Sequence, residues 1–151
     1  MARSSARFVF AAVSALSVAV ATAHAAGVVL ITPEEAKLPP PKIAVSMPAR
    51  GVTRGPQVEW VQAADPTRSP THLQVKFRSH GGANVDASSV RMTYLRTPDV
   101  DLTARIKPFV TDAGIDLPDA IVPPGSHTLR VDLKDSDGRS GTLSFVLNVA
   151  Q

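Results

Sequence analysis

The chain has 151 residues, with 16 Lys plus Arg against 13 Asp plus Glu, four His and no Cys. This length is typical of a single domain, and the absence of Cys excludes a fold that depends on disulfides. A net charge of +3 gives little support for a polyanion-binding surface, so we expect no nucleic-acid partner.

Residues 1–25 are predicted to be a signal peptide. Two arginines precede an apolar run from Phe8 to Val20, and Ala23-His24-Ala25 places small side chains where a signal peptidase reads them. Cleavage before Ala26 leaves 14 basic against 13 acidic residues; cleavage after Ala23 stays open and would make His24 the first residue. As a helix, the thirteen residues of the apolar run would span roughly 20 Å, which is less than the ~30 Å hydrocarbon core of a membrane. We therefore expect a periplasmic or secreted protein without stable membrane insertion.

Residues 26–55 are predicted to form a Pro-rich extended arm. Eight of the thirteen prolines fall between Pro33 and Pro70, and proline fixes φ and removes amide donors. Such an arm can at best add edge pairing to a sheet. Two interpretations stay open: a flexible spacer, or an arm packed along the domain through Val28, Leu30 and Ile43, which we favour.

Residues 56–151 are predicted to form an all-β, immunoglobulin-like antiparallel β-sandwich. Short runs alternate apolar and polar residues and are separated by turn residues every ten or so positions, which is typical of half-buried strands in a sandwich. The residues that we expect to face the core are Val58 and Trp60; Leu73, Val75 and Phe77; Val90, Met92 and Tyr94; Leu129, Val131 and Leu133; and Leu143, Phe145, Leu147 and Val149.

Three connections carry further local signals. Asp137-Gly138 supplies the positive φ that a tight hairpin needs between the last two strands. We predict a single helical turn at Asp101 to Phe109, with Asp101 as its cap. The alternative for this segment is an irregular edge strand. We predict an extended segment at Ile115 to Val122 that is interrupted by Pro118.

The run from Val122 to Leu147 resembles the C-terminal hairpin of bacterial immunoglobulin-like domains, which show P-G-x-H-x-L-x-V-x-V-x-D-x-x-G before an alternating final strand. Val85 to Met92 resembles the I-D-x-x-S-V-x-V stretch of the same family. The likeness covers about residues 56–150, without the Cys, Trp, Cys framework of antibody domains. It implies a spacer, adhesin or accessory module. We therefore expect an exported, monomeric, non-catalytic binding or structural module of the bacterial cell envelope, with an unknown envelope protein or polymer as its partner.

A second resemblance gives an alternative function. Periplasmic copper-resistance proteins are small sandwiches that bind copper through a mature N-terminal His and a late Asp-Gly-His motif. Cleavage after Ala23 would expose His24, and Asp137-Gly138 lies in a comparable hairpin, but Arg139 replaces the second His. The alternative is thus a periplasmic copper-binding protein that uses its N-terminal His.

No residue type stands in a pattern that predicts catalysis or a cofactor. His72, His80 and His127 show no zinc-site spacing and are expected to be scattered surface histidines. Ser126 and His127 are neighbours on a strand and should point to opposite faces. Asp135 and Asp137 precede Gly138 as in a calcium loop, but the first and twelfth ligand positions carry no carboxylate, so a hairpin turn explains them.

Two surface features remain as binding hypotheses. Trp60 and Tyr94 could offer a sugar platform, but both fall on the apolar phase of their strands, so we predict core positions with partnered polar tips. The polar phase is basic at Lys76, Arg78, Arg91, Arg130 and Lys134, interleaved with Glu59 and Asp132, which is typical of a solvated face. We expect partner contact through the sandwich loops or by pairing of an exposed edge strand.

Overall fold

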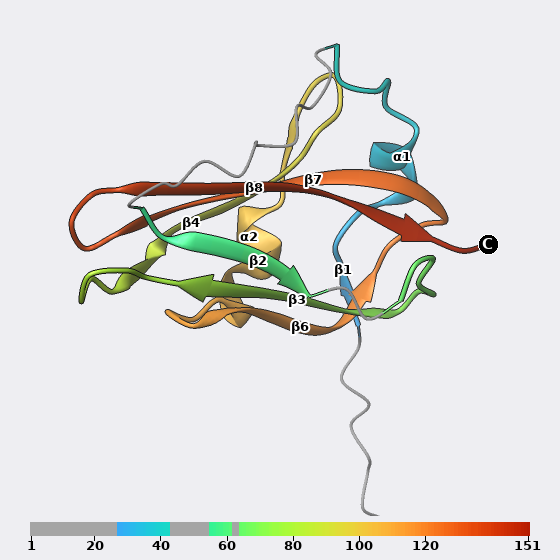
Figure 1. The fold of residues 1–151 in the computed structure, drawn as a ribbon. Coiled ribbons are helices and arrows are strands. Elements are labelled where there is room, and N and C mark those ends of the chain that lie inside the picture. Colours follow the sequence, from blue (N-terminus) through green and yellow to red (C-terminus); the bar gives the residue numbers. More distant parts are fainter. Residues whose placement is uncertain (1–26, 43–54, 62–63) are drawn as a thin grey trace, which may run out of the picture.

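The structure, a computed structural model, describes residues 27–42, 55–61 and 64–151, and within these residues two four-stranded sheets lie face to face (Figure 1). The predicted signal peptide and Ile43 lie outside the described residues. The strands are β1 (Val28–Val29), β2 (Gln57–Val61), β3 (Thr71–Arg78), β4 (Val85–Tyr94), β5 (Val100–Asp101), β6 (Gly114–Ile121), β7 (Gly125–Asp135) and β8 (Ser140–Val149).

The first sheet has the order β1-β6-β3-β2 and the second has the order β5-β4-β7-β8. All pairs of neighbouring strands are antiparallel except β1 and β6, which are parallel. The prediction of an all-β sandwich is confirmed, but its first sheet is not purely antiparallel because the N-terminal arm contributes β1.

The core lies between the sheets and follows the predicted period of two. Every second residue of β3 is buried from Thr71 to Phe77, and the same alternation runs along β7. All the predicted core-facing residues join the core, with Val58, Trp60 and Leu143 only partly buried at its margin. Burial of apolar surface on this scale is the main force that holds the two sheets together.

The predicted helical turn is confirmed as α2 (Thr103–Ile106), followed by the 3-10 turn η1 (Lys107–Phe109). Its predicted cap is wrong by one residue, because the N-cap position is Leu102. Asp101 ends β5, and its Oδ1 accepts a hydrogen bond of 2.8 Å from the amide of Thr103. The region is therefore both an edge strand and a helical turn.

Pro118 does not interrupt β6, which runs continuously from Gly114 to Ile121. The pairing of β6 with β3 shifts its register between Leu73 and Thr71, which pair with Leu117 and Ala120. Pro118 lies in this irregularity, where a missing amide donor removes no regular ladder bond. The strand survives because its proline is confined to the bulge.

The described part of the arm, residues 27–42, packs on the sandwich. Leu30 and Ile31 are completely buried in the same core as the strands. The arm then forms α1 (Pro33–Ala36), whose capping box joins Thr32 and Glu35. This helical turn was not predicted, although Thr-x-x-Glu with proline at the first helical position is a recognised start signal.

A candidate binding edge

β8 is the outermost strand of the second sheet. Hydrogen bonds at its C-terminal end show which of its backbone amides and carbonyls point away from β7. The carbonyl of Asn148 accepts from the amide of Thr67 at 2.9 Å, and the amide of Ala150 donates to the carbonyl of Thr67 at 2.7 Å. These groups therefore point away from β7. Since backbone groups of alternate residues point to the same side of a strand, the amides and carbonyls of Thr142, Ser144 and Val146 also point outward.

Both ends of this edge are closed by other parts of the chain. Thr67 forms a bridge with Val149, and the side-chain amide of Asn148 donates to Asp65 at 3.0 Å. At the other end, a Cβ on Gly141 would lie 2.2 Å from the carbonyl oxygen of Pro56. Gly141 is thus needed for the close approach of the chain that leads into β2.

Between these two ends, the part of β8 from Thr142 to Val146 has an outer edge that is unpaired among the described residues, and we call it the β8 window. Among residues 27–42, 55–61 and 64–151, no backbone group pairs with the outward amides and carbonyls of Thr142, Ser144 and Val146. Unpaired groups in a row are a template for one more strand.

Apolar side chains line the inner side of the same margin. β2 is the outermost strand of the first sheet and contacts β8 across the sandwich. The ring of Trp60 stacks on Phe145 with the ring centroids 4.5 Å apart, and Val58, Trp60 and Leu143 are partly buried. A strand added to the window would turn every second side chain toward this apolar surface.

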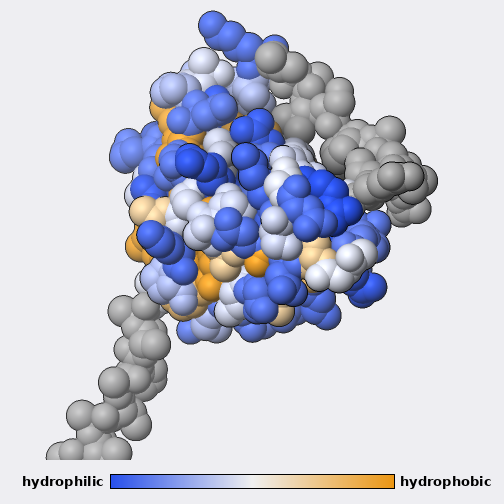
Figure 2. Space-filling view, turned by 90° about the vertical axis from the view of Figure 1, so that its left-hand side faces the viewer, coloured by the Kyte–Doolittle hydropathy of each residue, from blue (hydrophilic) through white to orange (hydrophobic). Residues whose placement is uncertain are grey.

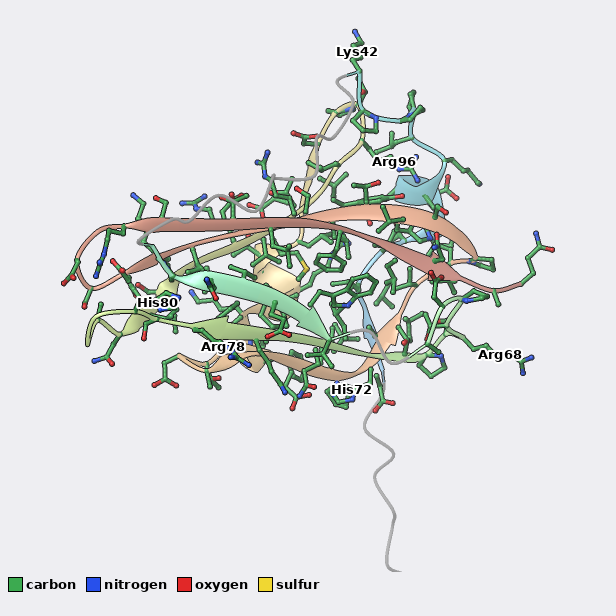
Figure 3. All side chains as sticks on the ribbon, in the orientation of Figure 1. Lys42, Arg68, His72, Arg78, His80 and Arg96 are labelled. Carbon is green, nitrogen blue, oxygen red and sulfur yellow. The ribbon has the colours of Figure 1, made fainter. Side chains whose placement is uncertain are left out.

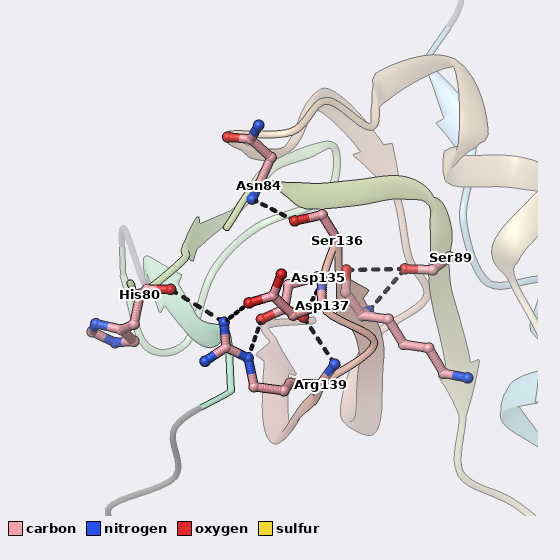
Figure 4. Close-up of polar contacts among 8 residues, drawn as sticks. His80, Asn84, Ser89, Asp135, Ser136, Asp137 and Arg139 are labelled. Atoms are coloured by element: carbon pink, nitrogen blue, oxygen red, sulfur yellow. Dashed lines mark hydrogen bonds and ion pairs between the residues drawn. The ribbon is translucent and has the colours of Figure 1, made fainter. Parts of the chain in front are cut away.

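The hairpin between β7 and β8 uses its acidic residues to hold its own turn (Figure 4). Oδ1 of the buried Asp135 accepts from the amides of Asp137 at 3.0 Å and Arg139 at 2.8 Å, and its Oδ2 accepts from Nε of Arg139 at 3.0 Å. Arg139 also pairs with the carboxylate of Asp137. Gly138 has the positive φ of 76° that the turn requires. The hairpin interpretation of these acids is confirmed.

The described residues include three histidines, which lie on β3 (His72), in the loop that follows it (His80) and on β7 (His127). In Figure 3, His72 lies on the outer face of the first sheet and His80 lies in the turn at the far end of the molecule. His72 pairs with Asp116 at 2.5 Å. The prediction of a surface position is wrong for His127, which is 1 % exposed. His127 shares the apolar phase of Leu129, Val131 and Leu133 along β7, a signal that was present in the sequence.

The aromatic residues lie where the strand phase predicted them. Tyr94 is completely buried, and its hydroxyl contacts Nδ1 of His127 at 2.9 Å and Nε of Arg96 at 2.6 Å. Trp60 packs on Phe145 at the β2 and β8 margin. The prediction of a core position with a partnered polar tip is confirmed for Tyr94, whereas Trp60 is only partly buried at the margin of the core.

The charged residues on the outer faces include several local pairs. Arg78 lies 3.5 Å from Glu59 and Arg130 lies 2.9 Å from Asp132, while Thr142 donates to Asp132 at 2.8 Å. Exposed pairs of this kind contribute little to stability. Figure 2 shows a mainly hydrophilic end of the molecule with small hydrophobic patches. The solvated-face interpretation fits these contacts.

The sequence predicted neither a catalytic group of residues nor a metal site, and the structure places the residues that were considered for these roles. Ser126 donates to the side chain of Asn148 at 2.6 Å, while its neighbour His127 points into the core. Among residues 27–42, 55–61 and 64–151, no three His, Asp or Glu side chains are placed to hold a metal ion. His24, on which the copper alternative depends, lies outside these residues.

None of the helices in the described part of the chain is both long and apolar enough to cross a membrane. Comparison with known proteins found no matching family model, no matching curated protein and no matching solved structure.

Proposed function

We propose that this chain is an exported, non-catalytic immunoglobulin-like binding module of the bacterial envelope, and that it binds a partner by adding a strand at the β8 window. Export rests on the basic start, apolar run and small-residue cleavage site of residues 1–25. The binding mode rests on the geometry of β8.

The strand order supports the immunoglobulin-like type. β2, β3 and β6 form one sheet, and β5, β4, β7 and β8 form the other. In immunoglobulin-like sandwiches the strands A, B and E share one sheet and C, F and G share the other, with C′ beside C in some members. Assigning β2 to β8 the letters A, B, C, C′, E, F and G in chain order reproduces that arrangement, with β1 as an addition.

The observation that carries the binding mode is the row of outward backbone groups at Thr142, Ser144 and Val146 beside Trp60 and Leu143. Main-chain hydrogen bonds provide affinity in strand addition, and pockets for alternate side chains provide specificity. We expect the partner to supply a short extended segment with apolar residues at alternate positions.

A second copy of β8 does not fit the window well. Antiparallel two-fold pairing centred on Ser144 would place Ser140 of the second copy opposite Asn148. The carbonyl of Asn148 is already bonded to Thr67. The closed end of the edge thus favours a segment that is shorter than β8 itself, in keeping with a monomeric module.

The test is photo-cross-linking in the periplasm of a Gram-negative host, with a photoreactive residue at Thr142. Ser144→Pro removes the central outward amide, whereas Ser144→Ala keeps it and removes only the hydroxyl. We expect one adduct with an envelope component that persists with Ser144→Ala and is lost with Ser144→Pro. Equal adducts in both variants would contradict strand addition.

The intact mass of the periplasmic protein tests export in the same preparation. A chain that begins at Ala26 or His24 supports cleavage of the predicted signal peptide. A chain that keeps Met1 to Ala25 would contradict it. A mass beginning at His24 with one copper ion would instead support the copper-binding alternative.

A further inference from the structure

Four groups form a continuous hydrogen-bonded chain where β4 and β7 meet at one end of the sandwich. Nε2 of His127 lies 2.8 Å from the carbonyl oxygen of Pro123, and Nδ1 lies 2.9 Å from the hydroxyl of Tyr94. The same hydroxyl accepts from Nε of Arg96 at 2.6 Å. His127 and Tyr94 are almost completely buried.

The chemistry of these partners fixes where the protons lie. A carbonyl oxygen only accepts, so Nε2 of His127 carries a proton and donates it to Pro123. Arg96 only donates, so the oxygen of Tyr94 accepts from Arg96, and the Tyr94 proton is free to point at Nδ1. A neutral imidazole protonated on Nε2 therefore satisfies every group in the chain.

A second proton on His127 would break this pattern. Nδ1 would become a donor facing Tyr94, whose own hydroxyl proton would lose its acceptor. The ionisable groups that act on the imidazole are Tyr94, in direct contact, and Arg96, through its charge; on the β8 side His127 pairs with the apolar Leu147. Burial is the largest influence, and it lowers the pKa of His127 from its usual 6.5. The hydrogen bond to Pro123 opposes this shift, and the Arg96 charge lowers the pKa by a smaller amount.

The same chain of contacts holds the N-terminal arm. Arg96 also donates through Nη2 to the carbonyl of Ser126 at 3.1 Å and lies over the ring of Tyr94. The next residue, Thr97, binds the arm twice, through its amide to Pro39 at 3.0 Å and through its hydroxyl to Pro40 at 3.1 Å. Figure 3 shows Arg96 and Lys42 on the same side of the second sheet.

We propose that His127 is an acid-sensitive latch, which holds Tyr94, Arg96 and the Thr97 contact with the arm in place when neutral and loosens that contact when it takes up a proton. Protonation places a second positive charge near Arg96 and removes the acceptor of Tyr94. Moving Arg96 away relieves the repulsion and frees the Tyr94 oxygen to accept from Nδ1 of His127. Thr97 follows Arg96 directly in the chain, so it moves with Arg96.

The sign of the response follows from linkage. Burial and the nearby Arg96 charge lower the pKa of His127 in the closed form, and an open form from which Arg96 has moved away takes up the proton more readily, so acid favours opening. The latch is therefore closed when His127 is neutral and loosens as the pH falls through the titration of His127.

The test is hydrogen exchange of the Thr97 amide in the full chain, corrected at each pH for the intrinsic exchange rate of an unstructured peptide. The pKa and tautomer of His127 are read from the same sample by NMR of the imidazole nitrogens. We expect the Nε2-protonated tautomer at neutral pH, and a corrected Thr97 exchange rate that rises as His127 titrates.

Two variants separate the latch from general acid instability. His127→Gln offers an amide that can accept from Tyr94 and donate to Pro123 but does not titrate, and it should abolish the acid response of Thr97. His72→Gln, on the exposed pair with Asp116, should leave that response unchanged. Should His127→Gln fail to fold, the wild-type measurement still decides: unchanged Thr97 protection across the titration of His127, or an Nδ1-protonated tautomer, overturns the proposal.

Discussion

At the margin formed by β1 and β5 the described residues cover the edges of the two sheets, whereas at the margin formed by β2 and β8 they leave the β8 window unpaired. The closed margin carries α1 and α2, joined through Glu35 and Arg105. Nη1 of Arg105 donates to the carbonyl of Leu30 and to Glu35, at 2.7 and 2.8 Å, and Nη2 donates to Glu35 at 2.7 Å. Nothing comparable faces Ser144 among the described residues.

Within the part of the chain that the structure describes, one sheet edge is therefore covered by other segments and part of the other edge is not. Exposed edges are an aggregation hazard, which proteins reduce with covering segments, charges or bulges. Here the covering segment is the arm, and the open edge is limited at both ends by Gly55-Pro56 and Thr67. A short, bounded opening limits pairing to short segments, which agrees with the proposed strand addition.

The largest effect should come from the closed margin. Leu30→Ala empties a completely buried position and should lower the free energy of unfolding by about 2–5 kcal/mol, because it removes apolar contact and leaves a cavity. Urea denaturation measures the loss. Val29→Ala is the matched control: Val29 is 45 % exposed, so we expect a change within about 0.5 kcal/mol. Equal effects would mean that the arm is not part of the core.

The next effect should come from the pair that fastens the arm. Glu35→Gln leaves Arg105 without its bidentate carboxylate and should cost about 1.5–3 kcal/mol. The neighbouring Glu34, whose carboxylate pairs with the exposed Lys37, serves as the control, and Glu34→Gln should change stability by less than about 1 kcal/mol.

The same pair gives a pH dependence. The hydrogen bonds from Arg105 are the largest influence holding the pKa of Glu35 at about 2, below its usual 4.5. The stabilisation is therefore fully present above about pH 4.5 and is lost as the pH falls toward 2. Urea midpoints measured from pH 6 to pH 2.5 should show this loss in the wild type and a flatter profile in Glu35→Gln.

The strand interiors could be predicted from the sequence because burial on one face imposes a period of two. That period correctly placed Leu73, Val75 and Phe77 in the core. It would also have placed His127 in the core, because His127 is in phase with the buried residues of β7, whereas the surface prediction relied on residue type alone. Strand phase is the better guide here, because a histidine with two fixed partners is satisfied in the core.

The closed margin could not be predicted in full. The sequence favoured a packed arm but left a flexible spacer open, because the nearby prolines are compatible with either. Leu30 and Ile31 are adjacent and both buried, so they lack the alternation of a sheet strand. One limit of the β8 window comes from Thr67, which contacts residues about 80 positions later. No local pattern reports such a contact, since it depends on how the two sheets are stacked.

A smaller effect should come from the apolar side of the open margin. Trp60→Leu removes the stacking on Phe145 and should cost about 1 kcal/mol, near the value of one aromatic pair. Binding to the partner segment should weaken more than stability does, because Trp60 lines the margin that the segment would cover. Denaturation midpoints and cross-linking yield at Thr142 measure the two effects separately. A loss of stability without a loss of adduct would mean that the partner segment does not pack on Trp60.

The smallest effect on stability should come from the window itself. The amide of Ser144 points away from β7 and has no partner among the described residues, so Ser144→Pro removes no ladder bond, and proline is tolerated on edge strands. We expect a loss below about 1 kcal/mol. Gln74→Pro is the matched comparison, since β3 is paired on both sides and the lost amide leaves a carbonyl unsatisfied, at a cost of about 1–3 kcal/mol plus backbone strain. Similar losses for the two prolines in urea denaturation would mean that the outward amide of Ser144 is already paired, and that the window is closed.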